Sequence, residues 1–348
     1  MRWEPLVETT QIKGDSETHP VLSPDDEFAD FESWDFGNFG LRPTTPELMK
    51  TDYSRSALKI GLAQADELGV NPFKFGMIGA TDSHTSWSNA EEDNYLGKYA
   101  TASPEPDRWS KKFPPDTVPG ILFQFEEWQR SQSGYAAVCA GENTRAAIWD
   151  AMERKEVYAT TGPRMTVRFF GGWEYEAEDA MRNNLAAIGY SKGVPMGGDL
   201  PASNDAASPN FLISAMRDPD GANLDRVQII KGWQDSEGEL HEKVHDVVWS
   251  GDRAIGDNGK LEPVGTTVNL DSATYANSIG SPYLSTVWSD PDFDPNESAF
   301  YYARVLEIPT PRWTAFDEVR FGVRMDDAVT RVLQERAYTS PIWYTPKQ

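Results

Sequence analysis

The sequence predicts an α/β half followed by a mostly antiparallel β half, with the change near residue 160. In the first half, a β-branched run at 6–12, a helical run at 53–68 and an apolar run at 73–80 alternate as in α/β proteins. From residue 157 onwards, short alternating runs separated by turn clusters dominate, as in an antiparallel β-sandwich. We therefore expect one domain over 1–160 and a second over 161–348.

Capping and breaker residues mark the elements of the first half. Asp52 is suited to cap the helix over 53–68, and Gly69 is suited to end it. The apolar strand at 73–80 runs directly into Thr-Asp-Ser-His at 81–84. Polar residues that follow a buried strand in this way stand where α/β proteins bind their ligands.

Two long irregular segments separate these elements. Residues 14–51 are rich in Asp, Pro, Ser and Gly, and residues 85–143 contain five prolines between 104 and 119. We expect ordered loops here, with one short helix near 121–130. Loops of this length in a compact domain are more often functional than idle. A stronger helix is expected over 145–156, after the capping candidate Thr144.

The second half reads as strands joined by tight turns. Asp218–Gly221 and Asp235–Gly238 have turn chemistry, since glycine supplies a positive φ at no steric cost. The strands that we expect are 165–170, 211–215, 227–233, 241–249 and 300–307.

Composition excludes several classes of protein. With 32 Lys and Arg against 55 Asp and Glu, the net charge of −23 argues against a nucleic-acid partner. No run approaches the roughly 18 apolar residues of a membrane-spanning helix, so we expect a soluble chain. The single cysteine, Cys139, excludes an intrachain disulfide and a cysteine-based zinc site. Only four histidines are available to a metal centre.

The sharpest motif is the pair Asp82 and His84, directly after the strand at 73–80. Residues two apart on an extended segment point the same way, so the pair offers a carboxylate oxygen and an imidazole nitrogen to one divalent metal. The alternative is an Asp–His hydrogen bond that caps a loop. Glu17 and His19 offer the same pair after the strand at 6–12. If the two strands are neighbours, all four side chains can converge.

Other motifs are weaker. His241 and His245 are spaced like a helical zinc pair, but the segment alternates as a strand and no third ligand accompanies it, which favours a structural role. Arg164 could clamp an anion, although an arginine at a domain junction more often bridges carboxylates. Glycine-rich phosphate loops and a G-x-S-x-G nucleophile motif do not occur in the sequence.

Several long segments resemble a bacterial family catalogued as domain of unknown function 3604 (DUF3604), and the resemblance runs over nearly the whole chain. That family is in turn similar to the polymerase-and-histidinol-phosphatase (PHP) superfamily of metal-dependent phosphoesterases, which have a distorted (β/α) barrel. The segments are EPLVE at 4–8, QIKGDSETHP at 11–20, DEFADFE at 26–32, GATDSHT at 79–85, ATTGPR at 159–164, QIIKGW at 228–233, RVLEIPTPRW at 304–313 and YTSPIWYTP at 338–346.

The resemblance implies a fold and a site. The fold would be the C-terminal part of a PHP-like barrel followed by the β-sandwich. Asp82 and His84 match the terminal D-x-H metal motif, Glu17 and His19 are further ligand candidates, and Glu8 is a weaker one. The H-x-H motif with which family members begin does not occur in the sequence. We therefore expect a fragment whose divalent metal, Zn, Mn or Fe, is incompletely coordinated.

These expectations lead to two functions from different classes. The first is a metal-dependent hydrolase, acting on a small-molecule or phosphoester substrate through a metal-activated water, with little or no activity in this chain alone. The second is a non-catalytic binding module for a carbohydrate or another ligand, built on the β-sandwich with a barrel remnant. The oligomeric state and the compartment stay open, with export to the periplasm or secretion one option for the full-length parent.

Overall fold

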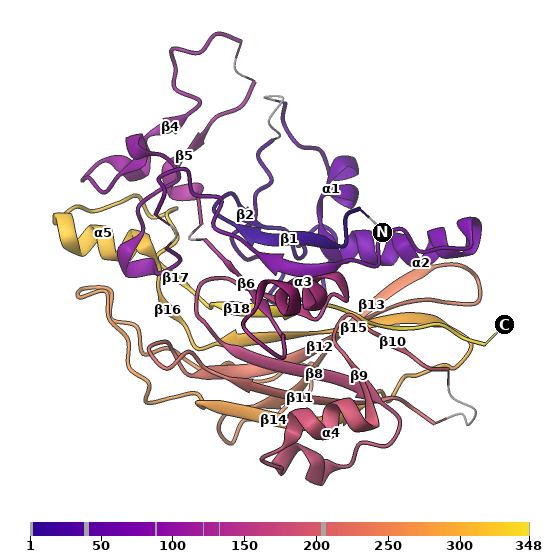
Figure 1. Ribbon diagram of the computed structural model, residues 1–348. Coiled ribbons are helices and arrows are strands. Elements are labelled where there is room, and N and C mark those ends of the chain that lie inside the picture. The colour runs from indigo at the N-terminus through magenta and orange to yellow at the C-terminus, as the bar shows by residue number, and fades with distance from the viewer. Residues whose placement is uncertain are drawn as a thin grey trace.

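A computed structural model of the chain describes residues 3–37, 42–87, 89–120, 122–131, 133–202 and 207–347. Three layers lie one above another (Figure 1): an N-terminal layer at the top, a large sheet in the middle and a smaller sheet at the bottom. The fold is mixed α/β with mostly antiparallel sheets and few helices. In the described part of the chain, no helix has both the length and the apolar composition that crossing a membrane requires.

The N-terminal layer is built on a β–α–β crossover. Strand β1 (Leu6–Gln11) pairs in parallel with β3 (Gly76–Gly79), and helix α2 (Ser54–Leu68) lies between them in the sequence. Strand β2 (Gly14–Asp15) pairs antiparallel with β1, and helix α1 (Pro46–Asp52) precedes α2. These elements confirm the strand and helix expected before residue 80. The cap of α2 is Tyr53 rather than Asp52, because α1 ends at Asp52.

The middle sheet has eight strands and joins both halves of the sequence. Strands β6 and β7 belong to residues 1–160 and yet hydrogen-bond into the sheet, β7 antiparallel to β18. The sheet therefore crosses the boundary expected at residue 160. Its strands are β6 (Tyr135–Val138), β7 (Val157–Thr160), β10 (Asp199–Leu200), β12 (Leu224–Gln234), β13 (Leu240–Trp249), β15 (Ser298–Glu307), β18 (Arg336–Thr339) and β19 (Ile342–Tyr344).

The lower sheet packs face to face against the middle one. It consists of β14 (Tyr283–Ser289), β11 (Asn210–Met216), β8 (Thr166–Gly172) and β9 (Gly193–Pro195), paired antiparallel in that order. A buried cluster fills the space between the sheets, and in it the rings of Phe211 and Tyr301 lie 4.5 Å apart. This packing of apolar and aromatic side chains is the sandwich that the alternating sequence pattern predicts.

The middle sheet is buried on its other face as well. Leu58 and Leu62 of α2 pack with Met77 of β3 against that face, where Ile230 and Phe300 lie. Successive residues of a strand point to opposite faces, so neighbouring residues of β12 and β15 enter different cores. Both faces of these two long strands therefore hold apolar residues, although β12 also carries the buried polar side chains of Asp225, Arg226 and Gln228.

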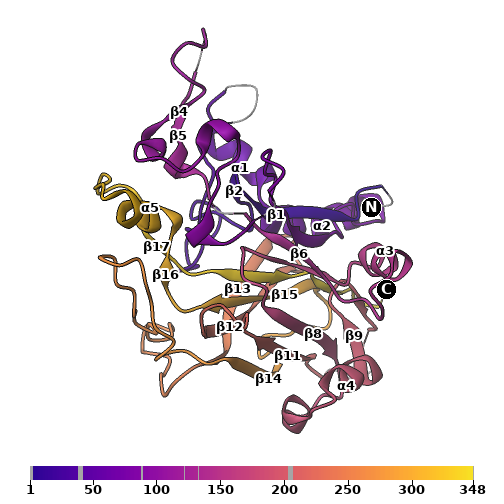
Figure 2. The ribbon, with the colours of Figure 1, turned by 60° about the vertical axis from the view of Figure 1, so that its left-hand side comes forward.

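The remaining elements lie around this frame. A helix near 121–130 was expected, but the described residues there form only a short strand and a 3₁₀ turn, Glu127–Gln129. The helix prediction was wrong because β5 pairs with β4 and a capping box of Glu126 and Gln129 closes the turn. Strands β4 and β5 project away from the sandwich (Figure 2). These elements are α3 (Arg145–Glu153), α4 (Leu185–Lys192), α5 (Trp313–Phe321), β4 (Lys112–Phe113), β5 (Phe125–Glu126), β16 (Thr310–Pro311) and β17 (Val332–Leu333).

A buried charge network joins the N-terminal layer to the middle sheet. Arg304 of β15 donates to both carboxylate oxygens of Asp26, at 2.9 and 2.7 Å, and to Glu17 at 3.2 Å. Arg55 of α2 donates to Glu17 at 3.1 Å and to Asp26 at 2.8 Å. The two guanidinium groups outweigh the cost of burial and hold the pKa of Asp26 well below its usual range.

We predict that Arg304→Met lowers the free energy of unfolding by about 3–5 kcal/mol, since it leaves two buried carboxylates with one guanidinium between them. Urea unfolding at pH 7 measures this change. Arg324→Met is the matched control, because the side chain of Arg324 is 84% exposed. The control is expected to change stability by no more than about 0.5 kcal/mol. A loss below about 1 kcal/mol in the Arg304 variant would contradict the assigned role.

Candidate functional site

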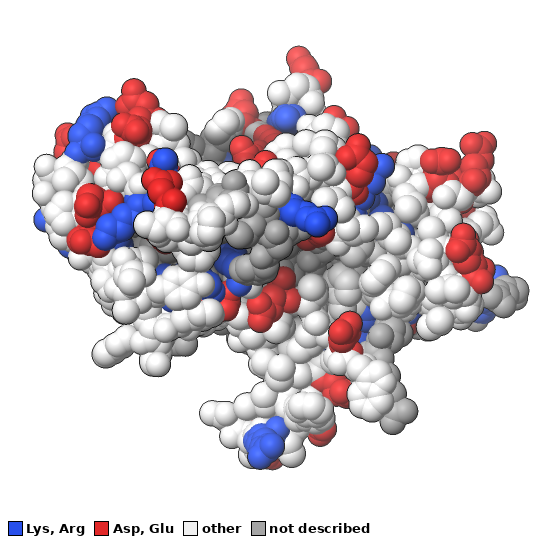
Figure 3. Space-filling model, turned by 90° about the horizontal axis from the view of Figure 1, so that it is seen from above, with Lys and Arg blue, Asp and Glu red and all other residues white. Residues whose placement is uncertain are grey.

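A cavity of about 270 Å³ opens beside the carboxyl end of β1. This is the edge at which parallel strands of α/β folds present their ligand-binding loops. Charged side chains line the cavity together with six aromatic rings, those of Trp34, Tyr53, Tyr99, Phe113, Phe123 and Phe125. Seen from above, acidic and basic side chains are interspersed over this face of the molecule (Figure 3). The cavity is therefore a local site rather than part of an extended basic surface.

Three cationic side chains meet at the cavity. Lys13 lies in the turn between β1 and β2, Lys98 precedes the 3₁₀ turn Ala100–Ala102, and Arg130 follows the turn Glu127–Gln129. The Arg130 guanidinium lies 4.7 Å from the centroid of the Phe125 ring. Burial, followed by nearby positive charge, lowers the pKa of Lys13 and of Lys98 to about 8.

The two lysines hold the carboxylate of Asp82. Lys98 Nζ donates to Asp82 Oδ2 at 2.6 Å and to the Asp82 carbonyl at 2.7 Å, and Lys13 also contacts Oδ2. His84 Nε2 lies 3.2 Å from Asp82 Oδ1 and 3.3 Å from Lys98 Nζ. The positive charge of Lys98 lowers the pKa of His84, so this imidazole favours its neutral form. The structure thus brings Asp82 and His84 together, as the motif predicts.

Close backbone packing fixes the position of the Asp82 loop. A Cβ at Gly79 would lie 2.7 Å from the Tyr135 carbonyl oxygen and 2.8 Å from that of Thr160, so only glycine fits where β3 meets β6 and β7. Ser133 Oγ donates to the Thr81 carbonyl at 3.1 Å. Asp82 itself has a φ of +46°. Residues other than glycine rarely adopt this conformation, and those that do are frequently found at functional sites.

Three buried polar atoms around the cavity have no hydrogen-bond partner among the described residues: Asp15 Oδ2, Tyr53 Oη and Arg130 Nη2. Buried polar groups are normally satisfied, and nine further atoms elsewhere among the described residues share this state. Asp15 Oδ1 accepts from the Glu17 amide at 2.8 Å. Burial and the negative charge of Glu17 raise the pKa of Asp15 to about 7.

The structure does not bring Glu17 and His19 to Asp82. Glu17 is bound by Arg55, Arg304 and Tyr302 in the buried charge network. His19 lines a different cavity, of about 590 Å³, where its Nδ1 accepts from the Val21 amide at 3.2 Å. Strands β1 and β3 are neighbours, which convergence of the four side chains required, but the chain reverses into β2 and carries residues 16–19 toward the middle sheet.

The two weaker candidates lie at separate places. Glu8 is exposed on β1, lines the cavity, and accepts from Gln11 Nε2 at 3.3 Å. Arg164 has a side chain that is 69% exposed, 3.5 Å from Glu91, at another cavity. Lys13, Lys98 and Arg130 are the site residues that sequence reasoning missed. Their only signal was that long loops tend to be functional, which does not single out individual cations.

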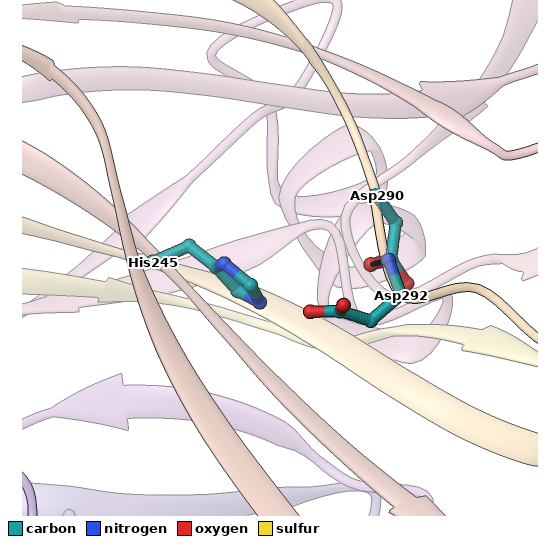
Figure 4. Close-up of side chains that lie close together, drawn as sticks. All are labelled: His245, Asp290 and Asp292. Carbon is teal, nitrogen blue, oxygen red and sulfur yellow. Dashed lines mark hydrogen bonds between the residues drawn. The ribbon is translucent and has the colours of Figure 1, made fainter. Parts of the chain in front are cut away.

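A separate group of potential metal ligands lies on the sandwich. His245 of β13 faces Asp290 and Asp292, with the ligand atoms of all three within 4.8 Å of one another (Figure 4). Lys231 Nζ lies 2.7 Å from Asp290 Oδ2, and Lys243 Nζ lies 2.5 Å from Asp292 Oδ2. Two ammonium groups therefore already balance the two carboxylates, and a metal ion would have to displace them.

His241 and His245 both lie on a strand, as the alternation of the segment predicts. His241 Nε2 lies 2.7 Å from Asp235 Oδ2, and its ring stacks on Trp233. His241 therefore makes a polar contact with Asp235 and a ring contact with Trp233 within one hairpin, which accounts for it structurally.

The fold and the site define a mixed α/β protein, mostly antiparallel, with a cavity lined by aromatic and charged side chains beside a parallel strand pair. The chain belongs to the family described as Protein of unknown function (DUF3604), whose model matches residues 1–346. No curated protein matches the sequence. The family description states no activity, and a fold by itself does not define one.

We predict that Asp15→Asn raises the free energy of unfolding much more at pH 8 than at pH 5. An unfolded aspartate ionises near pH 4, whereas folded Asp15 keeps its proton to about pH 7. The folded state therefore retains a proton that the unfolded state releases, and stability falls as the pH rises between these values.

Asparagine has no such proton to lose, so the gain at pH 8 can reach about 4 kcal/mol. Urea unfolding at the two pH values measures it. Asp66→Asn, at an exposed position on α2, is the control. An equal effect of Asp15→Asn at both pH values would show that burial does not hold this proton.

Proposed function

We propose that the cavity binds the anionic group of a small phosphoester and that the chain contributes to a hydrolase centre. One observation carries the proposal: Lys13, Lys98 and Arg130 converge on a cavity next to the Asp82–His84 pair. Three cationic side chains with buried aliphatic portions can bind an ester dianion, because charge-assisted hydrogen bonds are strongest where water is scarce. In this proposal, β1, α2 and β3 are one unit of a PHP-like barrel.

The Asp82–His84 pair supplies two ligand types that a divalent metal accepts. Two features oppose a complete centre. The lysines already hold Asp82 Oδ2, and among the described residues no third His, Cys, Asp or Glu atom joins the pair within 4.8 Å. The residues described here therefore do not form a metal centre alone. A bound Zn, Mn or Fe ion would supply an activated water, and further ligands would be needed to hold it.

The chain's own side chains suit the remaining steps of ester cleavage. Lys13, Lys98 and Arg130 would bind the non-bridging oxygens, on which negative charge is concentrated. A lysine whose pKa is about 8 still carries its proton at neutral pH, so it can donate that proton to a leaving oxygen. Neutral His84 can accept a proton from a water molecule, and the six aromatic rings limit water access.

We predict that the protein binds phenyl phosphate at pH 7. Lys13→Met and Lys98→Met should each weaken binding at least about tenfold, because each removes the free energy of one charge-assisted hydrogen bond. Affinity should fall between pH 7 and 9 as both ammonium groups lose their protons. Isothermal titration calorimetry measures both effects. Lys260→Met, at an exposed lysine, is the control. Unchanged affinity in both cavity variants would rule out an anion site here.

We predict slow turnover of p-nitrophenyl phosphate in the presence of Mn²⁺, Zn²⁺ or Fe²⁺, lost in Asp82→Asn and in His84→Gln. The rate should be low because the lysines compete with the metal for Asp82. Steady-state absorbance assays with and without a chelator measure it, and the Lys260 variant again serves as control. Turnover that survives both substitutions would contradict the proposed centre. Phenyl phosphate binding without any turnover would favour a non-catalytic binding module.

A further inference from the structure

A separate cavity, of about 600 Å³, is lined mainly by carboxyl groups among its charged residues. It lies between the 3₁₀ turn Glu92–Asn94, residues 162–164, the β11–β12 turn and the end of β15. Seven carboxylate side chains and one guanidinium, that of Arg164, line it. Carboxyl groups thus outnumber cations in a concave site, where each ionised group exerts a stronger field than it would on an open surface.

Three of the carboxylates are not matched by cations. Glu307 is 1% exposed, and its Oε1 has no hydrogen-bond partner among the described residues. Glu335 is 4% exposed and accepts from the Thr161 hydroxyl, while Glu92 accepts from the Trp313 amide. In the described part of the chain, no ion pair involves Glu92, Glu307 or Glu335. A buried, unpartnered carboxylate oxygen lining a cavity is the kind of group that a bound cation would satisfy.

Burial also works against ionisation of these groups. Desolvation raises the pKa of Glu307 and Glu335 well above the usual range, and the carboxylates around them add to the effect. Desolvation likewise raises the pKa of Glu92. A cation that enters the cavity would favour the charged forms and supply the missing partners.

The cavity suits an organic cation better than a metal ion. Ligation of a metal needs several donor atoms close together, and the described residues place three such atoms within 4.8 Å only at His245, Asp290 and Asp292, outside this cavity. A volume of about 600 Å³ also exceeds what one ion fills. Tyr275 and Phe316 add two aromatic rings to the wall, which can contact methylene groups or an ammonium group.

We propose that this cavity binds a small aliphatic polyamine, with its ammonium groups on Glu307, Glu335 and the carboxylates at the rim. A polyamine carries separated positive charges on a flexible methylene chain, so it can contact several separated carboxylates and the aromatic walls at once. A compact ion cannot reach all of these groups. The site shares no lining residue with the cavity of Lys13 and Lys98, so it does not depend on the function proposed there.

Calorimetric titration of the full chain with spermidine at pH 7.5 and about 0.1 M salt tests the proposal. We expect saturable binding that Glu307→Gln weakens at least about tenfold, as expected when one partner of a buried charge pair is removed. Glutamine has the shape of a protonated glutamate, so the thermal unfolding midpoint should change little. Asp66→Asn is the matched control, because it removes an exposed carboxylate on α2.

The rim offers a second test that does not depend on folding of the Glu307 variant. Asp93→Asn and Asp220→Asn change exposed carboxylates of the cavity, and together they should weaken spermidine binding about threefold. Putrescine, with fewer charges, should bind more weakly than spermidine. Spermidine affinity that is unchanged by Glu307→Gln, or lowered equally by Asp66→Asn, would overturn the proposal. Tighter, Glu307-dependent binding of Ca²⁺ than of spermidine would overturn it in favour of a metal site.

Discussion

The pairing of Glu17 and Asp26 with Arg55 and Arg304 is the interaction on which the arrangement of the N-terminal layer depends. Each of the four side chains is almost fully buried, so none can lose its partners without leaving a charge in a low-dielectric interior. The two acids come from the loop after β2, and the two arginines come from α2 and β15. This network therefore fixes the loop, the helix and the middle sheet relative to one another.

The same constraint decides what the site contains. Because Glu17 is bound within the network, its charge faces Asp15 from the buried side and contributes to the raised pKa of that residue. The reversal from β1 into β2 that delivers Glu17 to the network also places Lys13 at the cavity. Residues 13–16 thus line the cavity and Glu17 belongs to the network, and a metal site that used Glu17 would break the contact between two layers.

Local sequence patterns predicted the parts of the fold that local physics determines. The strand at 6–12, the helix at 53–68 and the strands of the sandwich have the expected type, and Asp82 meets His84 because two residues of spacing suffice. The pairing of β7 with β18 and of Arg304 with Asp26 spans much of the chain, and periodicity carries no information about such partners. Lys98 and Arg130 come from loops, where side-chain positions depend on the surrounding fold.

The two proposed sites would bind ligands of opposite charge on one acidic chain. A net charge of −23 repels an anion at long range, but salt screens exposed charges beyond about 8 Å. Within that distance, Lys13 and Lys98 pair with Asp82, and Arg130 pairs with Glu127, so the cations of the first cavity are partly neutralised. An anion in the proposed site would be held by these cations at short range, with no gain from steering. The carboxylate-lined cavity and the chain as a whole both carry negative charge. A cation would therefore be attracted at long range by the net charge and at short range by the cavity.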